Sequence, residues 1–366
     1  MENMNQQYPA GWKGVASRFG GFWRYPDMKD YCFLVNPYFP TQKMIDEMRG
    51  MFETLLTEYP SGMRYNAQFA ATMFNVSVEQ ILPGNGASEL IKLFMEDVIG
   101  KVGFVYPTFE EYPNRIAAER RVVFNPLDEG FRYSAKDLME FFADKGLSCI
   151  CLVNPDNPSG NLLSVAEIEE LALWAARQSI KIWIDESFAD FADRDKRATL
   201  IDSELLSEHP NLYVIKSIGK SFGVPGCRLG VLASGDIEFI AAAKKKVSIW
   251  NINPFGEFFM EIMPKYRAEY DAGCDAIENE RKRFVELLEG IPFLRVFPSQ
   301  SNYVLAKVSP PYSATTLTNL LWDKHKILLK DCSNKKGFPD TSFVRITIRD
   351  QHDNDFFLSK LRDLKT

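Results

Sequence analysis

A lysine that can act as a nucleophile stands in the stretch SIGKSFGVPGCRLG, residues 217–230. The apolar run LYVI (212–215) lies just before this stretch. Ser217 precedes Lys220 by three positions, and Arg228 follows Lys220 by eight. A lysine amine can form a Schiff base with an aldehyde, and a hydroxyl and an arginine can hold a phosphate group. These residue types could serve a phosphorylated aldehyde, although a lysine by itself is most often a surface charge.

Polar residues also stand at the ends of other short β-rich runs. Asp185 directly follows KIWI, and the turn NPDNPSG (154–160), which contains Asn157, directly follows CICLV. The small residues GNGAS (84–88) precede a helical stretch, where backbone amides can bind an anion. Each feature alone is explained by a helix cap, a turn or a surface charge. Their recurrence at successive strand ends favours a single shared site.

Pyridoxal phosphate catalysis needs all of these groups together. The cofactor aldehyde needs a lysine, and the pyridine nitrogen needs a carboxylate that keeps it protonated. The phosphate needs a helix N-terminus, hydroxyls and an arginine, while the phenolate oxygen needs an amide donor and the ring face an aromatic partner. The residues that would fill these roles are Lys220, Asp185, Gly86, Ala87, Ser88, Ser217, Arg228, Asn157 and an aromatic residue near Pro107.

The elements that would position these residues alternate along the chain. Six short β-rich runs, VGFV, RVVF, CICLV, KIWI, LYVIK and LGVLA, lie between residues 102 and 233, with helix-like stretches between most of them. One of these stretches begins with the capping box Ser164-x-x-Glu167. Such alternation predicts a mainly parallel sheet covered on both faces, whose ligands bind beyond the carboxyl ends of the strands.

A smaller lobe is predicted for the rest of the chain. A long helical region runs from about residue 254 to 289, and the runs FLRVF, NYVLAKV, KILLK and SFVRITI follow with fewer helices. The predicted fold class is therefore α/β. It comprises a large domain over residues 41–275 and a smaller α+β domain formed by residues 1–40 and 276–366.

Composition argues against several classes of protein. The 366 residues carry a formal net charge of −6, whereas a nucleic-acid-binding protein needs a basic face. No apolar stretch is long enough to span a membrane, and the polar start lacks the pattern of a secretion signal. The six scattered cysteines and three histidines show no metal-ligand spacing. We therefore expect a cytoplasmic protein without a metal, a nucleic-acid partner or a membrane partner.

The motifs resemble, in type and order, those of the class I/II aminotransferases, which have the aspartate-aminotransferase fold (pyridoxal-phosphate fold type I). S-x-x-K with its distant arginine, NPDNPSG and IDESFADF carry the resemblance. VNPYFP, EYPSG, VYPTFEEY and FVRITIR also have counterparts, so the resemblance covers nearly the whole chain. The nearest branches are histidinol-phosphate aminotransferase and threonine-phosphate decarboxylase. GNGASELI, VPGCRLG, DCSN and RITIR lean towards the decarboxylase.

The resemblance implies a role for each cofactor-binding residue. Lys220 would form the Schiff base and act as the general base, and Asp185 would pair with the pyridinium nitrogen. Asn157 would donate to the phenolate oxygen, and Phe109 would stack on the ring. Phe188 replaces a tyrosine of many relatives, which removes one hydroxyl from the phenolate side. The residues implied to hold the phosphate are Gly86, Ala87, Ser88, Ser217, Arg228 and, from the neighbouring subunit of a homodimer, Tyr59.

The resemblance also bears on the substrate. Arg345 of FVRITIR matches the arginine that binds the substrate carboxylate, and Lys330 and Arg349 are expected near the same pocket. A solvated strand-end charge is an equal alternative for Arg349. The decarboxylase branch has H-G-G-N where this chain has FGGF (19–22), and an arginine where it has Lys330. A lysine lacks the bidentate fork of an arginine, so these departures put threonine phosphate in doubt.

Three functions remain open. The leading one is an aminotransferase that acts on a small phosphorylated or phosphonylated amino compound through a ping-pong cycle, because the departures from the decarboxylase motifs favour transamination. The second is a threonine-phosphate-decarboxylase-like lyase. The third is a non-catalytic cofactor-fold module, such as the effector domain of a transcription factor. Nothing before residue 40 has the pattern of a helix-turn-helix with a basic face, so the third is the weakest.

Overall fold

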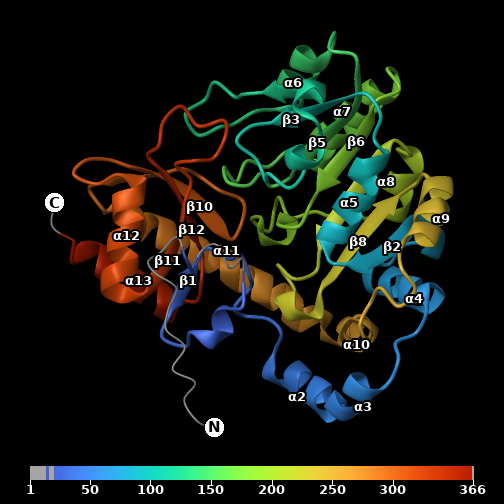
Figure 1. Cartoon of the computed structure of the whole chain (residues 1–366), viewed down its shortest axis with the longest axis horizontal. Helices are drawn as coiled ribbons and strands as arrows, with labels where there is room; N and C mark the ends of the chain where they lie inside the picture. The colour runs from blue at the N-terminus through green and yellow to red at the C-terminus, as the bar shows by residue number, and fades with distance from the viewer. Residues whose placement is uncertain (1–13, 16–19, 365–366) are drawn as a thin grey trace.

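The computed structural model describes residues 14–15 and 20–364, and it contains two β-sheets with helices packed around them (Figure 1). The larger sheet has the strand order β2-β8-β7-β6-β5-β3-β4. Strands β7, β6, β5, β3 and β4 are parallel, as the alternation predicted. These seven strands are β2 (Ile81–Asn85), β3 (Lys101–Val105), β4 (Arg121–Phe124), β5 (Leu147–Val153), β6 (Lys181–Asp185), β7 (Leu212–Ser217) and β8 (Leu229–Ser234).

Sequence periodicity missed one strand of this sheet. The six β-rich runs form β3 to β8, but β2 contains Pro83 and Gly84, residues that disfavour a strand. The proline is tolerated because β2 is an edge strand that pairs only with β8. Strand β8 runs antiparallel to β7, and the loop that joins them (218–228) contains the 3-10 helix η6 (Pro225–Cys227) but no crossover helix.

Helices cover both faces of the large sheet, so its central strands are buried on both sides. In β6, Ile182 and Ile184 pack into one apolar core, whereas Trp183 between them packs into another on the opposite face. Helix α5 lies on the Trp183 face, where Phe94 stacks on the indole at 3.8 Å between ring centroids. Helices α6, α7 and α8 contribute to the other core. The helices are α5 (Ala87–Asp97), α6 (Ala135–Phe142), α7 (Val165–Ala176), α8 (Ser203–Glu208) and α9 (Ile237–Lys246).

The smaller sheet has the strand order β1-β11-β12-β10-β9. Strand β1 pairs in parallel with β11, so this N-terminal strand is part of the smaller sheet. Helices α12 (Ala314–His325) and α13 (Gln351–Arg362) pack on this sheet around a third apolar core. The strands are β1 (Lys29–Tyr31), β9 (Leu294–Val296), β10 (Tyr303–Val308), β11 (Ile327–Asp331) and β12 (Phe343–Thr347).

Helix α11 (Arg267–Glu289) extends from the region of α10 to the smaller sheet, as Figure 1 shows. The predicted domain boundary at 275/276 falls inside this helix and stays a prediction. No helix among the described residues is long and apolar enough to cross a membrane. The remaining elements are α2 (Gln42–Gly50), α3 (Phe52–Thr57), α4 (Met63–Phe74), α10 (Pro254–Ile262), η1 (Phe22–Arg24), η2 (Val78–Gln80), η3 (Pro113–Arg115), η4 (Ala118–Arg120), η5 (Ala189–Phe191) and η7 (Met263–Tyr266).

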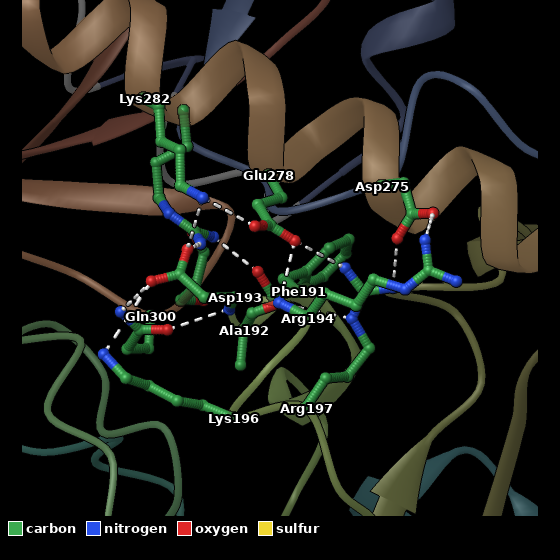
Figure 2. Close-up of polar contacts among 12 residues, drawn as sticks. Phe191, Ala192, Asp193, Arg194, Lys196, Arg197, Asp275, Glu278, Lys282 and Gln300 are labelled. Carbon is green, nitrogen blue, oxygen red and sulfur yellow. Dashed lines mark hydrogen bonds and ion pairs between the residues drawn. The ribbon is translucent and has the colours of Figure 1, made fainter.

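An ionic network joins α11 to the loop that follows β6 (Figure 2). Arg281 of α11 is 3% exposed and donates to the Ser301 carbonyl at 2.9 Å and to Asp193 at 2.7 Å. The side-chain oxygen of Gln300 accepts from the backbone amide of Asp193 at 2.9 Å, and the backbone amide of Gln300 donates to the Gly160 carbonyl at 3.0 Å. The network therefore connects the segments after β5 and β6 with the smaller sheet.

Candidate active site

The residues predicted from separate β-rich runs meet at one edge of the large sheet. Asp185 ends β6 and Ser217 ends the adjacent parallel strand β7, so both stand at carboxyl ends. The backbone amide of Asn154, which follows β5, donates to the Asp185 carbonyl at 2.8 Å. The Ser217 amide donates to Ser187 Oγ at 2.8 Å. The motifs that follow β5, β6 and β7 therefore meet at the carboxyl ends of these strands, where the sequence placed them and where parallel sheets bind ligands.

Asp185 lies almost completely buried, with both carboxylate oxygens bonded. Its Oδ1 accepts from the Ser187 amide at 2.9 Å, and its Oδ2 accepts from the Tyr112 hydroxyl at 2.7 Å. Burial raises the pKa of Asp185, while these bonds and the nearby Lys220 ammonium oppose the rise. Sequence reasoning missed Tyr112, although it stands three residues after Phe109 and could have been found as a second aromatic residue in VYPTFEEY.

Lys220 lies in the turn that follows β7. Its carbonyl accepts from the backbone amides of Asn36 at 3.0 Å and Gly223 at 3.1 Å. Burial, the largest cause, and the Arg345 guanidinium together lower the pKa of Lys220 to about 8, against the opposing effect of the Asp185 carboxylate. About half of the amine is therefore neutral near pH 8, and the neutral form is the one that attacks an aldehyde.

The start of α5 and Arg228 form a cradle for an anion. Arg228 has φ 54° and ψ 55°, a left-handed conformation that is uncommon for a residue with a side chain. Gly86 has a φ of 77°, which side chains disfavour, and a Cβ atom there would lie 2.5 Å from Nη2 of Arg228, so the guanidinium packs against bare glycine backbone. Ala87 begins the helix, and Ser88 stands exposed in its first turn. Together they offer amides, a hydroxyl and a guanidinium, the donors that a phosphate requires.

Arg345 of β12 reaches from the smaller sheet to the loop after β5. Its Nη1 donates to Asn157 Oδ1 at 2.7 Å, its Nη2 donates to the Cys32 carbonyl, and its buried Nε has no partner among the residues that the structure describes. Lys330 of β11 stands opposite Arg345 in the antiparallel register. The structure therefore joins a predicted substrate residue to a predicted cofactor residue, and it adds a second cation beside them.

Two predicted residues lie apart from this arrangement. Arg349 donates from Nε to Asp353 at 2.7 Å and from Nη1 to the Asp30 carbonyl at 2.9 Å, so most of its donors are used within the chain. Tyr59 is 79% exposed, and its ring packs against Trp250 with centroids 4.7 Å apart. The roles given to both residues stay predictions.

Three further side chains complete the description. Phe109 is 40% exposed, and its ring lies edge-on to Tyr112. Phe188 is buried against the ring of Tyr303, and Phe19 of FGGF lies outside the described residues. Lys335, which sequence reasoning missed, has a side chain that is 13% exposed and an ammonium 4.0 Å from Glu110. Burial lowers the pKa of Lys335, and its signal in the sequence was the lysine pair after DCSN.

These residues fit pyridoxal phosphate by the chemistry of their donors. An amine with a lowered pKa, a buried carboxylate and a cradle for a dianion surround the same strand ends, on Lys220, Asp185 and Arg228. The residues that would hold the cofactor are therefore placed as its functional groups require.

Comparison with known proteins points to the same chemistry. The family model of aminotransferase class I and II matches residues 51–361. The chain is 30% identical to the CMP-5'-(3-aminopropyl)phosphonate synthase of Streptomyces rubellomurinus over 96% of its length, but spans only 55% of that protein. It is 31% identical to the L-serine phosphate decarboxylase of Sulfurospirillum multivorans, over 92% of this chain and 88% of that one.

A solved structure shows the same fold. The histidinol-phosphate aminotransferase from Clostridium acetobutylicum superposes with a TM-score of 0.80 at 27% identity, over 92% of this chain and 98% of that one. The relatives therefore include both decarboxylases and aminotransferases.

Proposed function

The chain belongs to the family of class I and II aminotransferases, which are pyridoxal 5'-phosphate enzymes, and on that premise we propose that it decarboxylates a small amino acid carrying a phosphate or phosphonate group. The observation that carries the substrate class is the excess of cations beside Asn157. Arg345 and Lys330 both lower the pKa of Lys335, and within the described part of the chain its one ion pair is with Glu110 at 4.0 Å. One carboxylate would need fewer cations, so a substrate with two anionic groups fits better.

Asp185 and Lys220 would have different roles beside the bound cofactor. The bound cofactor supplies an aldehyde that captures the substrate amine and a protonated ring that withdraws electrons from the bonds at Cα. Asp185, held by Tyr112 and Ser187, would keep its charge beside the ring nitrogen. Lys220 would carry a proton on Nζ to or from the substrate, because its pKa of about 8 lies near neutral pH.

The phosphate of the cofactor would be held apart from that of the substrate. We assign the first to the cradle of Gly86, Ala87, Ser88, Ser217 and Arg228, which lies on the large sheet. We assign the anionic groups of the substrate to Arg345 and Lys330, which lie on strands of the smaller sheet, and to Lys335 in the loop between these strands. Asn157 would lie between the two groups, since its amide oxygen already accepts from Arg345.

The relatives support decarboxylation over transamination. The L-serine phosphate decarboxylase shares 31% identity with this chain and is covered over 88% of its length. Transamination stays the second candidate, because Lys330 lacks the bidentate fork that would orient a carboxylate. It is also supported by the similarity to the histidinol-phosphate aminotransferase, with a TM-score of 0.80.

The purified enzyme, loaded with pyridoxal phosphate, is expected to release carbon dioxide from O-phospho-L-serine or O-phospho-L-threonine without any oxo acid. The measurement is carbon dioxide against amine product, which should form in equal amounts. L-Serine, which lacks the phosphate, should be a poor substrate by a factor of roughly 10²–10³, because the cations would remain unpaired. Formation of an oxo product that requires a 2-oxo acid acceptor would instead identify an aminotransferase.

A homodimer is proposed from exposed apolar side chains. Phe52 and Leu56 of α3 are 55% and 64% exposed, and Tyr59, Ile249 and Trp250 are 79%, 74% and 49% exposed. Large apolar residues gathered in this way mark a protein interface. A second copy of the chain is the partner that the implied role of Tyr59 requires.

Mixing two inactive variants tests that role. Tyr59→Ala should weaken cofactor binding roughly 10- to 100-fold, because a hydrogen bond to a charged group is lost. Refolding it with an equal amount of Lys220→Ala should restore roughly a quarter of the wild-type activity at limiting cofactor, since each hybrid dimer has one intact site. The control is each variant refolded alone. If Tyr59 served its own subunit, no hybrid site would be intact and the mixture would stay inactive.

A further inference from the structure

A buried ionic cluster lies directly behind the proposed catalytic residues. Lys216 of β7 is 1% exposed, and its ammonium donates to Glu186 at 3.1 Å and to Asp190 at 2.9 Å. Asp190 also accepts from Ser221 Oγ at 2.6 Å, and the Tyr270 hydroxyl donates to the same Ser221 oxygen at 3.0 Å. The proposed mechanism uses none of these five residues.

Two members of the cluster are sequence neighbours of the catalytic residues. Glu186 follows Asp185 at the end of β6, and Ser221 follows Lys220 in the turn after β7. Asp185 bonds to Tyr112 and Ser187, whereas Glu186 bonds to Lys216, so the two adjacent carboxylates have separate partners. The cluster therefore ties the strand end that carries Asp185 to the turn that carries Lys220.

The charged groups of the cluster are well satisfied. Besides Lys216, Glu186 accepts from Thr199 Oγ1 at 2.6 Å and from the Leu200 amide at 2.7 Å. The two carboxylates raise the pKa of Lys216 in spite of its burial, so the ammonium keeps its charge. A buried polar network with satisfied partners holds a single geometry, because any displacement leaves a charge without a partner.

The position of the Lys220 amine decides which charges act on it. Arg345 from β12 and Arg228 lower its pKa, while Asp185 and Asp30 raise it, and burial is the largest cause of the net lowering. A turn that moved away from β6 would let water reach the amine and change this balance.

We propose, on the basis of the proposed function, that Lys216 is a positioning residue: its two ion pairs fix the turn that carries Lys220 relative to Asp185. The amine and the carboxylate then keep the arrangement that the chemistry requires. Misplacement of reacting groups by about 1 Å can cost roughly 10²-fold in rate, and Lys216 prevents such a displacement without touching the substrate.

The first test compares Lys216→Met with Lys216→Arg. In Lys216→Met we expect kcat to fall roughly 10²-fold with little change in KM, and in Lys216→Arg we expect most of the rate to return, because the guanidinium can bond both carboxylates. A second readout uses the apoenzyme, in which labelling of Lys220 by trinitrobenzenesulfonate is followed against pH by peptide mass spectrometry. The midpoint should rise from about 8 towards the ordinary value of lysine, because the amine becomes hydrated.

A triple variant distinguishes a positioning role of Lys216 from a simple loss of folding. Lys216→Met combined with Glu186→Gln and Asp190→Asn leaves no unpaired charge, so it should fold while keeping the low kcat and the raised midpoint. The control is Lys246→Met, which removes an exposed lysine paired with Asp97 and should change neither quantity. A triple variant with normal kcat and a normal midpoint would overturn the proposal. The apoenzyme midpoint reports on Lys220 even if no substrate is turned over, so failure of the proposed function is distinguishable.

Discussion

Replacement of Lys220 by alanine is expected to abolish turnover, with a loss of at least roughly 10⁴-fold in kcat. No other described lysine has a burial-lowered pKa beside Asp185, so no other amine could carry the proton. Borohydride reduction of the loaded wild-type enzyme, followed by peptide mapping, should find the pyridoxyl group on Lys220. Its recovery on a different lysine would contradict the assignment.

Lys220→Ala is also expected to change the stability of the protein. Lys220 has a pKa of about 8 in the folded protein, below its unfolded value of about 10.4, so the unfolded chain binds more protons between these two values. The burial penalty is therefore complete below pH 8 and fades as the pH rises. At pH 7 the free energy of unfolding of apo Lys220→Ala should exceed that of the wild type by about 1–3 kcal/mol. Urea unfolding should show a smaller difference between the two proteins at pH 9.5. A gap that widens with pH would contradict the lowered pKa.

Asp185→Asn is expected to lower kcat by roughly 10²–10⁴-fold while the protein stays folded. An amide cannot keep the pyridine nitrogen protonated, so the ring would withdraw electrons poorly. The fold should survive because an amide can still bond to the Ser187 amide and the Tyr112 hydroxyl, which hold the carboxylate now. Steady-state rates and the circular dichroism spectrum measure the two effects separately.

Asp236→Asn is a matched control for this substitution. Asp236 accepts from the Tyr213 hydroxyl at 2.6 Å and from the Phe239 amide at 3.0 Å, which are the same kinds of donor that hold Asp185. It caps α9, so its substitution should change stability slightly and leave kcat unchanged. A near-normal rate in Asp185→Asn would show that this residue, too, is only a cap.

Local sequence patterns predicted most of the fold, because strand burial and helix capping leave regular spacings of residue types in the sequence. In β6 the successive residues Ile182, Trp183 and Ile184 are all apolar, since the strand is covered on both faces, and Ser164 with Glu167 forms the capping box that its spacing predicted. Strand β2 was missed for a tertiary reason. Its proline is compatible with a strand only because β8 is its sole neighbour, and sheet order is not visible in a local pattern.

The sequence by itself determined the fold class and the chemistry of the cofactor site, because the strand-end rule converts motif order into proximity. Only the tertiary structure decided how the charged groups pair. Arg345 bonds to Asn157 from a different sheet, whereas Arg349, four residues later, donates to the Asp30 carbonyl. Which partner a charged side chain meets depends on packing between distant elements, and spacing along one strand carries no record of that packing.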